Sequence, residues 1–282
     1  MQIIILFLSI LFLSGCEKKD IAPHVYQQSV MNTMAEISLW DDGEEPARTG
    51  FREMERLEEL FSRFKAGSDI SRINKSLSAK VSKECVYLVK KSMYYAKLTG
   101  GAFDVTKKGA AVVVDGNTIS IGKETELDLG GIAKGYAVDR VVGILKRKKV
   151  DRAMVNLGGN FYLIGYPPGK RYWVVGIKNP LNPEKLIGRL RLETECGVAT
   201  SGNYERPGHI MNPKTGKSAD SVLSVTIVAP TALEADALST GVFVLGREMG
   251  AELVEKLPGV EGVIIDNNAV WVSSGLKDKF VK

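Results

Sequence analysis

The chain has 282 residues, of which 44% are hydrophobic and 25% are charged. This composition is ordinary for a folded globular protein and excludes disorder over most of the chain. The 38 basic and 33 acidic residues give a net charge of +5, and the densest basic run, Lys146 to Lys149, ends a predicted helix. Because cations suit a helix C-terminus, this run indicates a solvated helix end and no nucleic-acid partner.

The N-terminus reads as a secretion and lipidation signal. The run from Met1 to Ser14 is apolar and uncharged, and it is too short to anchor a helix across a bilayer. The segment LSGC, which ends at Cys16, resembles the lipobox of bacterial lipoproteins, although no basic residue precedes the apolar run. We therefore expect a signal peptide over 1–15 and a lipidated tether over 16–28. Acylated Cys16 would hold the protein on a bacterial membrane, facing the periplasm or extracytoplasmic space.

The few cysteines and histidines limit the kinds of catalytic and metal site that the chain can form. Cys85 and Cys196 are the only cysteines after Cys16, and they lie far apart in a predicted helix and a predicted strand. Neither a CxxC motif nor a Cys/His cluster accompanies them, so we expect two buried thiols and neither zinc nor cysteine catalysis. His24 lies in the expected tether, which leaves His209 as the one candidate for histidine chemistry.

The first half of the chain contains long helical patterns and short strand patterns. Asp115 and Gly116 give the clearest turn signal, since an Asp-Gly pair between apolar residues is typical of a β-hairpin. The expected elements are a strand over 30–40, a helix over 44–65, a short segment over 70–74, a helix over 81–98, a hairpin over 112–122 and a helix that ends near 148.

Short strand patterns dominate the second half. Helices cluster early and strands late, without the strict alternation of a doubly wound sheet, which favours an α+β fold with mixed or antiparallel strands. We find no internal repeat or low-complexity linker, so we expect one compact two-lobed domain over 29–282. The expected strands cover 153–159, 161–166, 172–180, 188–194, 197–205, 208–216, 222–230, 260–267 and 269–274, and the helices cover 230–246 and 247–257.

One expected helix carries an unusual polar pair. Residues 230–246 are mostly apolar, yet Asp236 and Thr240 lie four positions apart. This spacing stacks a carboxylate and a hydroxyl on one helix face, about 6 Å apart at the backbone. From these residues alone, a buried hydrogen-bonded pair is a better explanation than a metal site.

A glycine-rich turn precedes the helix that ends near 148. Its sequence, LDLGGIAKGYAVDR, places Asp128, two adjacent glycines and Lys134 where a strand turns into a helix. Free N–H groups and the positive end of the helix dipole at such a turn suit a phosphate, and Lys134 adds a full charge. The sequence matches neither GxGxxG nor GxxxxGK[ST], so a purely structural turn is an equally good interpretation.

Six segments resemble those of one protein family in order and spacing. They are GGAFDVT, LDLGGIAKGYAVDR, VNLGGN, ATSGNYE, HIMNPKTG and PTALEADALSTGVFVLG. They are similar to segments of the ApbE-type FAD:protein FMN transferases, a family of flavin-trafficking lipoproteins. The resemblance covers nearly the whole chain from Met31 onward, and it implies a flavin site between the two lobes.

The resemblance implies a magnesium site at the polar pair. In the family, the acid and the hydroxyl of this helix bind Mg²⁺ beside the flavin pyrophosphate; these map onto Asp236 and Thr240. A backbone carbonyl that maps onto Gly131 is the third ligand. Hard oxygen ligands suit magnesium, which completes its octahedron with water and phosphate. Ser239 departs from relatives that carry an acid at its position, so the resemblance does not support a second metal site.

The resemblance also implies a set of flavin contacts. Phe64 maps onto an aromatic residue that stacks on the isoalloxazine ring, although the sequence alone places it in the core of the first helix nearly as well. Met31 maps onto a methionine that touches the flavin, and Asn32 replaces the glycine that usually follows. Asn74 closes a segment that lines the same region. The implied cofactor-binding residues are Met31, Phe64, Ala102, Phe103, Asp104, Asp128, Lys134 and Met211.

The reaction implied is Mg²⁺-dependent transfer of FMN from FAD to a Thr or Ser hydroxyl of a target protein, with release of AMP. His209 maps onto the family's catalytic histidine, and an imidazole titrates near working pH, so it is the candidate base. Two alternatives remain open: an FAD pyrophosphatase that gives FMN and AMP, and a non-catalytic FAD-binding lipoprotein. The implied acceptors carry a Ser/Thr flavinylation motif and are membrane redox-complex subunits or FMN-binding-domain proteins.

Overall fold

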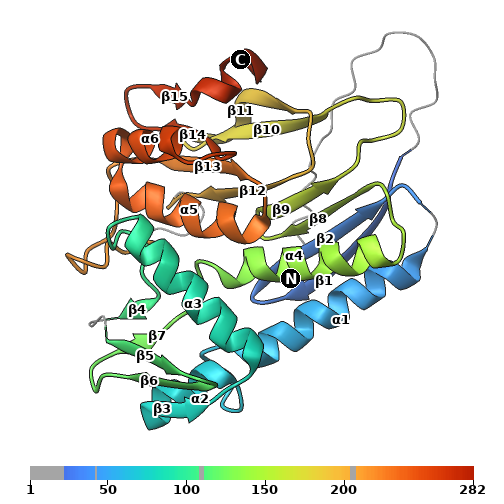
Figure 1. Cartoon of the computed structure of the whole chain (residues 1–282). Coiled ribbons are helices and arrows are strands. Elements are labelled where there is room, and N and C mark those ends of the chain that lie inside the picture. Colours follow the sequence, from blue (N-terminus) through green and yellow to red (C-terminus); the bar gives the residue numbers. More distant parts are fainter. Residues whose placement is uncertain (1–21, 42, 108–110, 204–207) are drawn as a thin grey trace, which may run out of the picture.

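The computed structural model describes residues 22–41, 43–107, 111–203 and 208–282 (Figure 1). The predicted signal peptide and Cys16 lie outside the described residues. Among the helices in these ranges, none is both long and apolar enough to cross a membrane.

An eight-stranded antiparallel sheet forms the centre of the molecule, in the order β1, β2, β8, β9, β12, β13, β14, β15. Both faces of the sheet are covered at its inner strands, and all six residues of β13 are accordingly buried. The strands are β1 (His24–Val30), β2 (Thr33–Leu39), β8 (Ala153–Leu157), β9 (Asn160–Ile164), β12 (Cys196–Ser201), β13 (Ser224–Ala229), β14 (Glu261–Ile265) and β15 (Val270–Val272).

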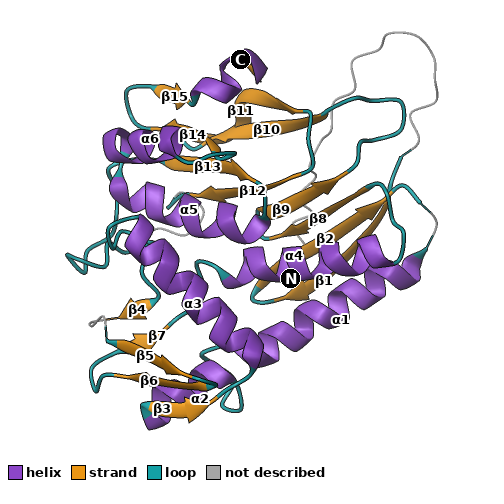
Figure 2. Cartoon of the chain, viewed as in Figure 1, coloured by secondary structure: helices purple, strands orange, loops and turns teal. Residues whose placement is uncertain are grey.

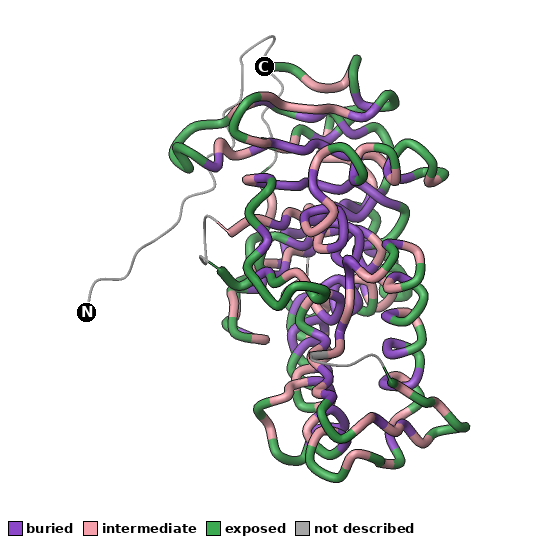
Figure 3. The backbone as a smooth tube through the Cα atoms, turned by 90° about the vertical axis from the view of Figure 1, so that its left-hand side faces the viewer, coloured by how far each residue is buried: buried purple, intermediate pink, exposed green. Residues whose placement is uncertain are grey.

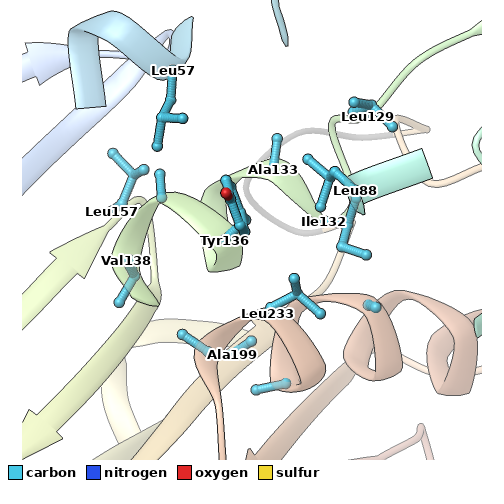
Figure 4. Packing of buried hydrophobic residues seen from close by; sticks show 14 of the residues in the cluster. Leu57, Leu88, Leu129, Ile132, Ala133, Tyr136, Val138, Leu157, Ala199 and Leu233 are labelled. Atoms are coloured by element: carbon cyan, nitrogen blue, oxygen red, sulfur yellow. The ribbon is translucent and has the colours of Figure 1, made fainter. Parts of the chain in front are cut away.

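Four helices cover one face of this sheet: α1 (Glu44–Phe61), α4 (Ala133–Arg147), α5 (Ala232–Leu245) and α6 (Arg247–Lys256) (Figure 2). Gly50 allows α1 to lie close to the sheet, because a Cβ there would approach Ile37 Cδ1 within 2.8 Å and Val141 Cγ1 within 2.9 Å. Figure 4 shows side chains from α1, α4, α5 and β8 meeting in this main core.

A small three-stranded sheet covers the other face. Its strands are β10 (Trp173–Asn179), β11 (Asn182–Leu192) and β16 (Phe280–Val281), and the 3₁₀ helix η1 (Ser274–Lys279) precedes β16. The inward residues of this sheet form a second hydrophobic cluster with the main sheet, which includes Trp173, Leu190 and Val198. Trp40, just after β2, packs edge-on against Trp173 with ring centroids 5.4 Å apart.

The second lobe consists of α2 (Asp69–Ser76), α3 (Lys83–Leu98) and two small sheets. In Figure 3 much of this lobe is exposed or half-buried, whereas buried backbone concentrates in the larger lobe. The predicted hairpin is confirmed, since β5 and β6 pair around Gly116, whose φ is 54°. The sheets contain β3 (Ser78–Lys80), β5 (Val112–Asp115) and β6 (Thr118–Ile121), and β4 (Thr106–Lys107) with β7 (Glu126–Leu127).

The α+β class and the single compact domain are confirmed, but the N-terminal elements differ from expectation. The predicted strand over 30–40 is a hairpin, because Met31 and Asn32 have φ of 51° and 57° and form a two-residue turn between β1 and β2. β1 begins at His24, so residues 24–28 belong to the sheet and not to a tether.

Two further predictions are wrong in their bounds. Helix α1 ends at Phe61, short of residue 65, because the hydroxyls of Ser68 and Ser71 donate to Ser62 O and tie the chain to the start of α2. The strand expected over 208–216 is absent from the described part, 208–218, where Met211 and Ser218 form one isolated bridge.

Candidate functional site

The motif segments gather at one end of the eight-stranded sheet. The β1–β2 turn lies at this end, and Gly158 in the β8–β9 turn donates its N–H to Met34 O over 3.1 Å. Ser201, the last residue of β12, reaches the same end. Helices α4 and α5 cross directly beside it, so segments far apart in the sequence meet here (Figure 1).

The crossing of α4 and α5 depends on Gly135. A Cβ on this residue would lie 2.3 Å from Ala232 O and 2.7 Å from Asp236 Cβ, so only glycine permits this approach. The Gly135 N–H donates to Asp236 Oδ2 over 2.8 Å. The glycine-rich turn and the Asp236 helix are therefore in direct contact.

Asp236 is a buried carboxylate with 3% of its surface exposed. Burial raises its pKa, while the nearby Lys134 ammonium and the Gly135 N–H act in the opposite direction. A buried carboxylate costs free energy unless hydrogen bonds or a cation compensate it. Asp236 therefore lies where a bound cation would stabilise the charged form.

Three hydroxyl groups lie close together beside Asp236, one from the end of β12 and two from α5. Ser201 Oγ lies 2.9 Å from Ser239 Oγ and 3.5 Å from Thr240 Oγ1. Ser239 Oγ also donates to the backbone oxygen of Asp236 over 3.0 Å. Ser239 thus has partners within the fold, while Thr240 lies one turn from Asp236 at the edge of this cluster.

Gly131 brings a backbone segment to Thr240. A Cβ on Gly131 would lie 3.5 Å from Thr240 Oγ1 and 3.2 Å from Phe103 Cε2, so its backbone runs between these two side chains. Asp236, Thr240 and the Gly131 carbonyl are all hard oxygen donors, which fits magnesium. The described residues contain no cluster of three His, Cys, Asp or Glu side chains suited to a metal, so a metal here would use one carboxylate with neutral oxygens.

Arg63, which follows the end of α1, forms an ion pair with the glycine-rich turn. The sequence analysis did not identify this residue as part of the site. Its Nε lies 3.1 Å from Asp128 Oδ2, and its Nη1 lies 3.2 Å from Glu126 Oε1. Its guanidinium carbon lies 4.3 Å from the centroid of the Phe64 ring. The only available sequence signal was a cation beside an aromatic residue, which does not reveal such a long-range pair.

Phe64 is not a core residue, because 70% of its surface is exposed. This observation removes the structural alternative for Phe64 and leaves its ring available to a ligand. In the adjoining turn, Asp128 Oδ1 accepts from Gly130 N over 3.0 Å and Lys134 Nζ donates to Gly130 O over 2.9 Å. The polar side chains predicted from this motif therefore order the turn through hydrogen bonds to its own backbone.

The 102–104 segment is mostly enclosed. Ala102 and Phe103 are buried, and Asp104 Oδ1 accepts from both the N–H and the hydroxyl of Thr106 over 2.8 Å. Phe103 lies beneath Gly131 and so supports the turn from within the core. Asn74 holds β7 in place, because its side-chain amide exchanges two hydrogen bonds with the backbone of Leu127.

His209 and Met211 lie on an exposed loop that begins, among the described residues, at 208. Asn203 holds this loop by accepting from Ile210 N over 3.2 Å and donating to Ala219 O over 2.7 Å. The loop adjoins the 101–104 segment, since a Cβ on Gly101 would lie 3.5 Å from Lys214 Cε. Met31, half-buried in the β1–β2 turn, is at the same sheet end.

A cavity of about 500 Å³ lies elsewhere, between α3, α4 and the start of α5, and none of the predicted site residues lines it. Its half-buried Asp139 accepts hydrogen bonds from the N–H groups of Ala232 and Leu233 and so caps α5, and desolvation raises the pKa of Asp139 to about 6. The two cysteines, Cys85 and Cys196, are buried free thiols as expected, with pKa raised to about 12 by burial.

Proteins of similar sequence are FAD:protein FMN transferases. One from Treponema pallidum is 37% identical over 172 residues, which cover 55% of this chain and 48% of that protein. The chain thus spans about half the length of this relative, and 52% of a Klebsiella pneumoniae relative that is 35% identical. One from Vibrio cholerae is 28% identical over an alignment 295 positions long, which covers 88% of each chain.

Solved structures share the fold. The ApbE protein of Thermotoga maritima is 28% identical with a TM-score of 0.81, covering 91% of this chain and 99% of that one. The flavin transferase ApbE of Vibrio cholerae is 25% identical with a TM-score of 0.80 over the same shares. The ApbE family model matches residues 31–116 and 108–264, so the chain belongs to the ApbE family.

Proposed function

We propose that this protein transfers FMN from FAD to a Thr or Ser hydroxyl of acceptor proteins and releases AMP. The observation that carries the proposal is the contact between the glycine-rich turn and α5, where Gly135 N donates to Asp236 Oδ2 over 2.8 Å and Gly131 lies beside Thr240. This contact joins two of the six family segments around one buried carboxylate. The names of the relatives support the same reaction.

Asp236, Thr240 and the backbone oxygen of Gly131 would hold Mg²⁺ in this proposal. The fit rests on their hard oxygen atoms and on the buried state of Asp236, whose charged form a cation would stabilise. Bound magnesium would neutralise pyrophosphate charge and so make AMP a better leaving group. Lys134, which already contributes positive charge beside Asp236, would assist in binding the same anion.

The exposed ring of Phe64 would stack on the isoalloxazine ring, with Arg63 covering part of the aromatic residue. Met31 and Met211 would supply apolar contacts from the two loops at this end of the sheet. Asp104 and Asp128 would accept hydrogen bonds from flavin or nucleotide hydroxyls, in addition to their present partners Thr106 and Gly130. The buried residues Ala102 and Phe103 would line the bottom of the flavin site.

His209 would take the proton of the acceptor hydroxyl. The hydroxyl oxygen then forms a bond to the phosphorus on the FMN side, the pyrophosphate P–O bond breaks, and AMP leaves with the bridging oxygen. His209 is exposed on its loop, which is the situation that a base serving a protein acceptor requires. Water in place of the acceptor hydroxyl would give FMN and AMP, the pyrophosphatase reaction.

We further propose that acylation of Cys16 attaches the protein to a bacterial membrane, facing the periplasm or extracytoplasmic space, near membrane redox-complex subunits or FMN-binding-domain proteins that serve as acceptors. Replacement of Cys16 by Ser should move the protein from the membrane fraction to the soluble extracytoplasmic fraction. The released protein should keep its activity, because Cys16 precedes the folded domain. Retention of the variant in the membrane would rule out the lipid anchor.

One assay tests the central proposal. The purified protein is incubated with FAD, with and without Mg²⁺, and with or without an acceptor domain that carries a Ser/Thr flavinylation motif. The proposal predicts AMP release together with an acceptor mass increase that matches FMN, both dependent on Mg²⁺. AMP release without acceptor labelling would establish the pyrophosphatase alternative, and FAD binding without AMP would establish a binding protein.

A further inference from the structure

The outer face of the small three-stranded sheet combines arginines with exposed apolar side chains. Arg191 pairs across strands with Val174, and Arg189 pairs with Val281; these four side chains point away from the second hydrophobic cluster. Val174 and Val281 are 54% and 42% exposed. We call this surface, completed by Tyr172 and Leu186, the basic sheet face.

The apolar residues of the basic sheet face pack on the sheet and remain partly exposed to solvent. Leu186 lies over Gly176, since a Cβ on Gly176 would be 3.0 Å from both of its δ carbons, and 46% of Leu186 remains exposed. The guanidinium of Arg191 lies 5.5 Å from the ring centroid of Tyr172. Neither Arg189 nor Arg191 forms an ion pair within the described part of the chain.

Charge is concentrated in the segments that build this sheet. Residues 170–192 and 277–282 together hold nine basic and two acidic side chains, a net charge of +7, whereas the whole chain carries +5. The remainder of the protein is therefore slightly acidic. A patch of cations with exposed aliphatic and aromatic groups suits an anionic lipid surface, where arginines bind phosphate and apolar side chains enter the headgroup region.

The N-terminal connection reaches the domain near this sheet. His24, the first residue of β1, pairs with Leu39, and the next residue, Trp40, packs against Trp173 at the start of β10. His24 comes eight positions after Cys16, a fully extended span of about 28 Å. An acyl group on Cys16, as proposed above, would hold this side of the protein near the bilayer.

We propose that the basic sheet face binds the anionic phospholipid surface of the membrane and fixes the orientation of the anchored domain. The flavin site lies on the helical side of the main sheet and at its end, whereas the basic sheet face lies on the opposite side. Contact of this face with lipid would therefore leave the flavin site open to the acceptor.

Vesicle binding tests the proposal without any flavin chemistry. The full chain carrying Cys16→Ser is mixed with vesicles of phosphatidylcholine, or of phosphatidylcholine with roughly one quarter phosphatidylglycerol, and bound protein is measured by flotation. The N-terminal segment is identical in all variants, so it cannot account for a difference in vesicle binding between them. We expect that preference to weaken as salt rises from about 0.05 to 0.5 M.

The double variant Arg189→Gln and Arg191→Gln should lower binding to anionic vesicles roughly 10-fold to 30-fold and leave binding to neutral vesicles unchanged. Lys90→Gln with Lys97→Gln removes the same charge from the exposed side of α3 and serves as the matched control. AMP release in solution should be normal in both, which separates this test from the proposed function.

Three outcomes would overturn the proposal. These are equal binding of the parent protein to both vesicle types, an equal loss in the α3 control, and unchanged anionic binding by the arginine variant. Binding of soluble polyglutamate through the same arginines, without vesicle binding, would assign the face to an acidic protein instead. A parent protein without AMP release but with arginine-dependent vesicle binding would refute the proposed function and retain this one.

Discussion

The guanidinium carbon of Arg63 lies 4.3 Å from the centroid of the neighbouring Phe64 ring. Because Arg63 also pairs with Asp128 at 3.1 Å, the exposed ring is connected to the glycine-rich turn. Arg63→Met should lose both contacts and lower FAD affinity roughly 3-fold to 10-fold, the range expected for a partly exposed cation–π contact and ion pair. Arg63→Lys, which keeps the charge, should lose less.

Titration of FAD followed by quenching of flavin fluorescence measures this effect. Phe64→Ala is the reference variant, since it removes the proposed stacking surface itself and should weaken binding more than Arg63→Met. Circular dichroism of each variant controls for folding. Wild-type affinity in Arg63→Met would mean that Phe64 needs no support from Arg63.

Gly135 gives a second prediction, because its Cβ position is occupied by the Ala232 carbonyl at 2.3 Å. Gly135→Ala must push α4 and α5 apart, which should destabilise the fold by about 1–3 kcal/mol or more and separate Gly135 N from Asp236. Gly143→Ala in the same helix is the control. A Cβ there meets only the end of the Arg147 side chain, at 3.5 Å, so better helix propensity should stabilise the protein by about 0.5–1 kcal/mol.

Urea unfolding of the two glycine variants provides the measurement. Opposite signs of the change in unfolding free energy are expected, and the Mg²⁺-dependent reaction should fail only in Gly135→Ala. If Gly135→Ala had wild-type stability, α4 and α5 would have to leave room for a methyl group at their crossing, contrary to the distances given above.

Local sequence signals predicted the elements that local chemistry controls. The Asp115-Gly116 pair gave the β5–β6 hairpin, because Gly116 adopts the positive φ that the turn requires. The helix expected over 230–246 is α5, and Thr231 caps its start because its side chain accepts a hydrogen bond from Glu234 N. The hydrogen-bond partner of the buried Asp236 was not evident from the sequence, since the Gly135 N–H reaches this carboxylate only because α4 lies against α5.

Long-range contacts explain the elements that the sequence did not reveal. No Gly or Pro stops α1 near Phe61; the end depends on Ser68 and Ser71, which bind Ser62 O from the next helix. The turn at Met31 was hidden because methionine rarely adopts positive φ, and Asn32 alone was a weak signal. The Arg63 pair joins residues 65 positions apart, which hydrophobic periodicity cannot indicate.

Asp236→Asn tests the metal through stability. Burial raises the pKa of Asp236 in the folded protein, so the folded state holds this proton more tightly than the unfolded state does. The Asp236 contribution to stability therefore falls as the pH rises above the ordinary Asp value of about 4. Without Mg²⁺, the Asn variant should be at least as stable as wild type at pH 7, and this difference should disappear at low pH.

Added Mg²⁺ should make the wild type more stable than Asp236→Asn at pH 7. A cation bound at Asp236 stabilises only the folded wild type, so its melting temperature should rise, by roughly 2–4 °C for each kcal/mol of binding free energy. The Asn variant should show no such rise, and its reaction should be lost without unfolding. Equal Mg²⁺ shifts in both proteins would place the metal elsewhere.

His209→Ala separates chemistry from binding. His209 is exposed on its loop, while the proposed FAD contacts come from Phe64, the glycine-rich turn and α5, so the variant should fold and bind FAD with nearly wild-type affinity. Transfer of FMN should fall by roughly 10²-fold to 10⁴-fold, the range for losing a general base. Higher pH should partly restore transfer, because hydroxide can then take the acceptor proton.

Acceptor labelling across a pH series, with FAD affinity followed separately, is the measurement. Asp236→Asn serves as the comparison, because hydroxide cannot replace lost charge neutralisation and its defect should persist at high pH. Equal losses of FAD binding and transfer in His209→Ala would make His209 a cofactor contact. A flat pH response with intact FAD binding would mean that another group accepts the proton, since only removal of the true base makes transfer depend on solvent hydroxide.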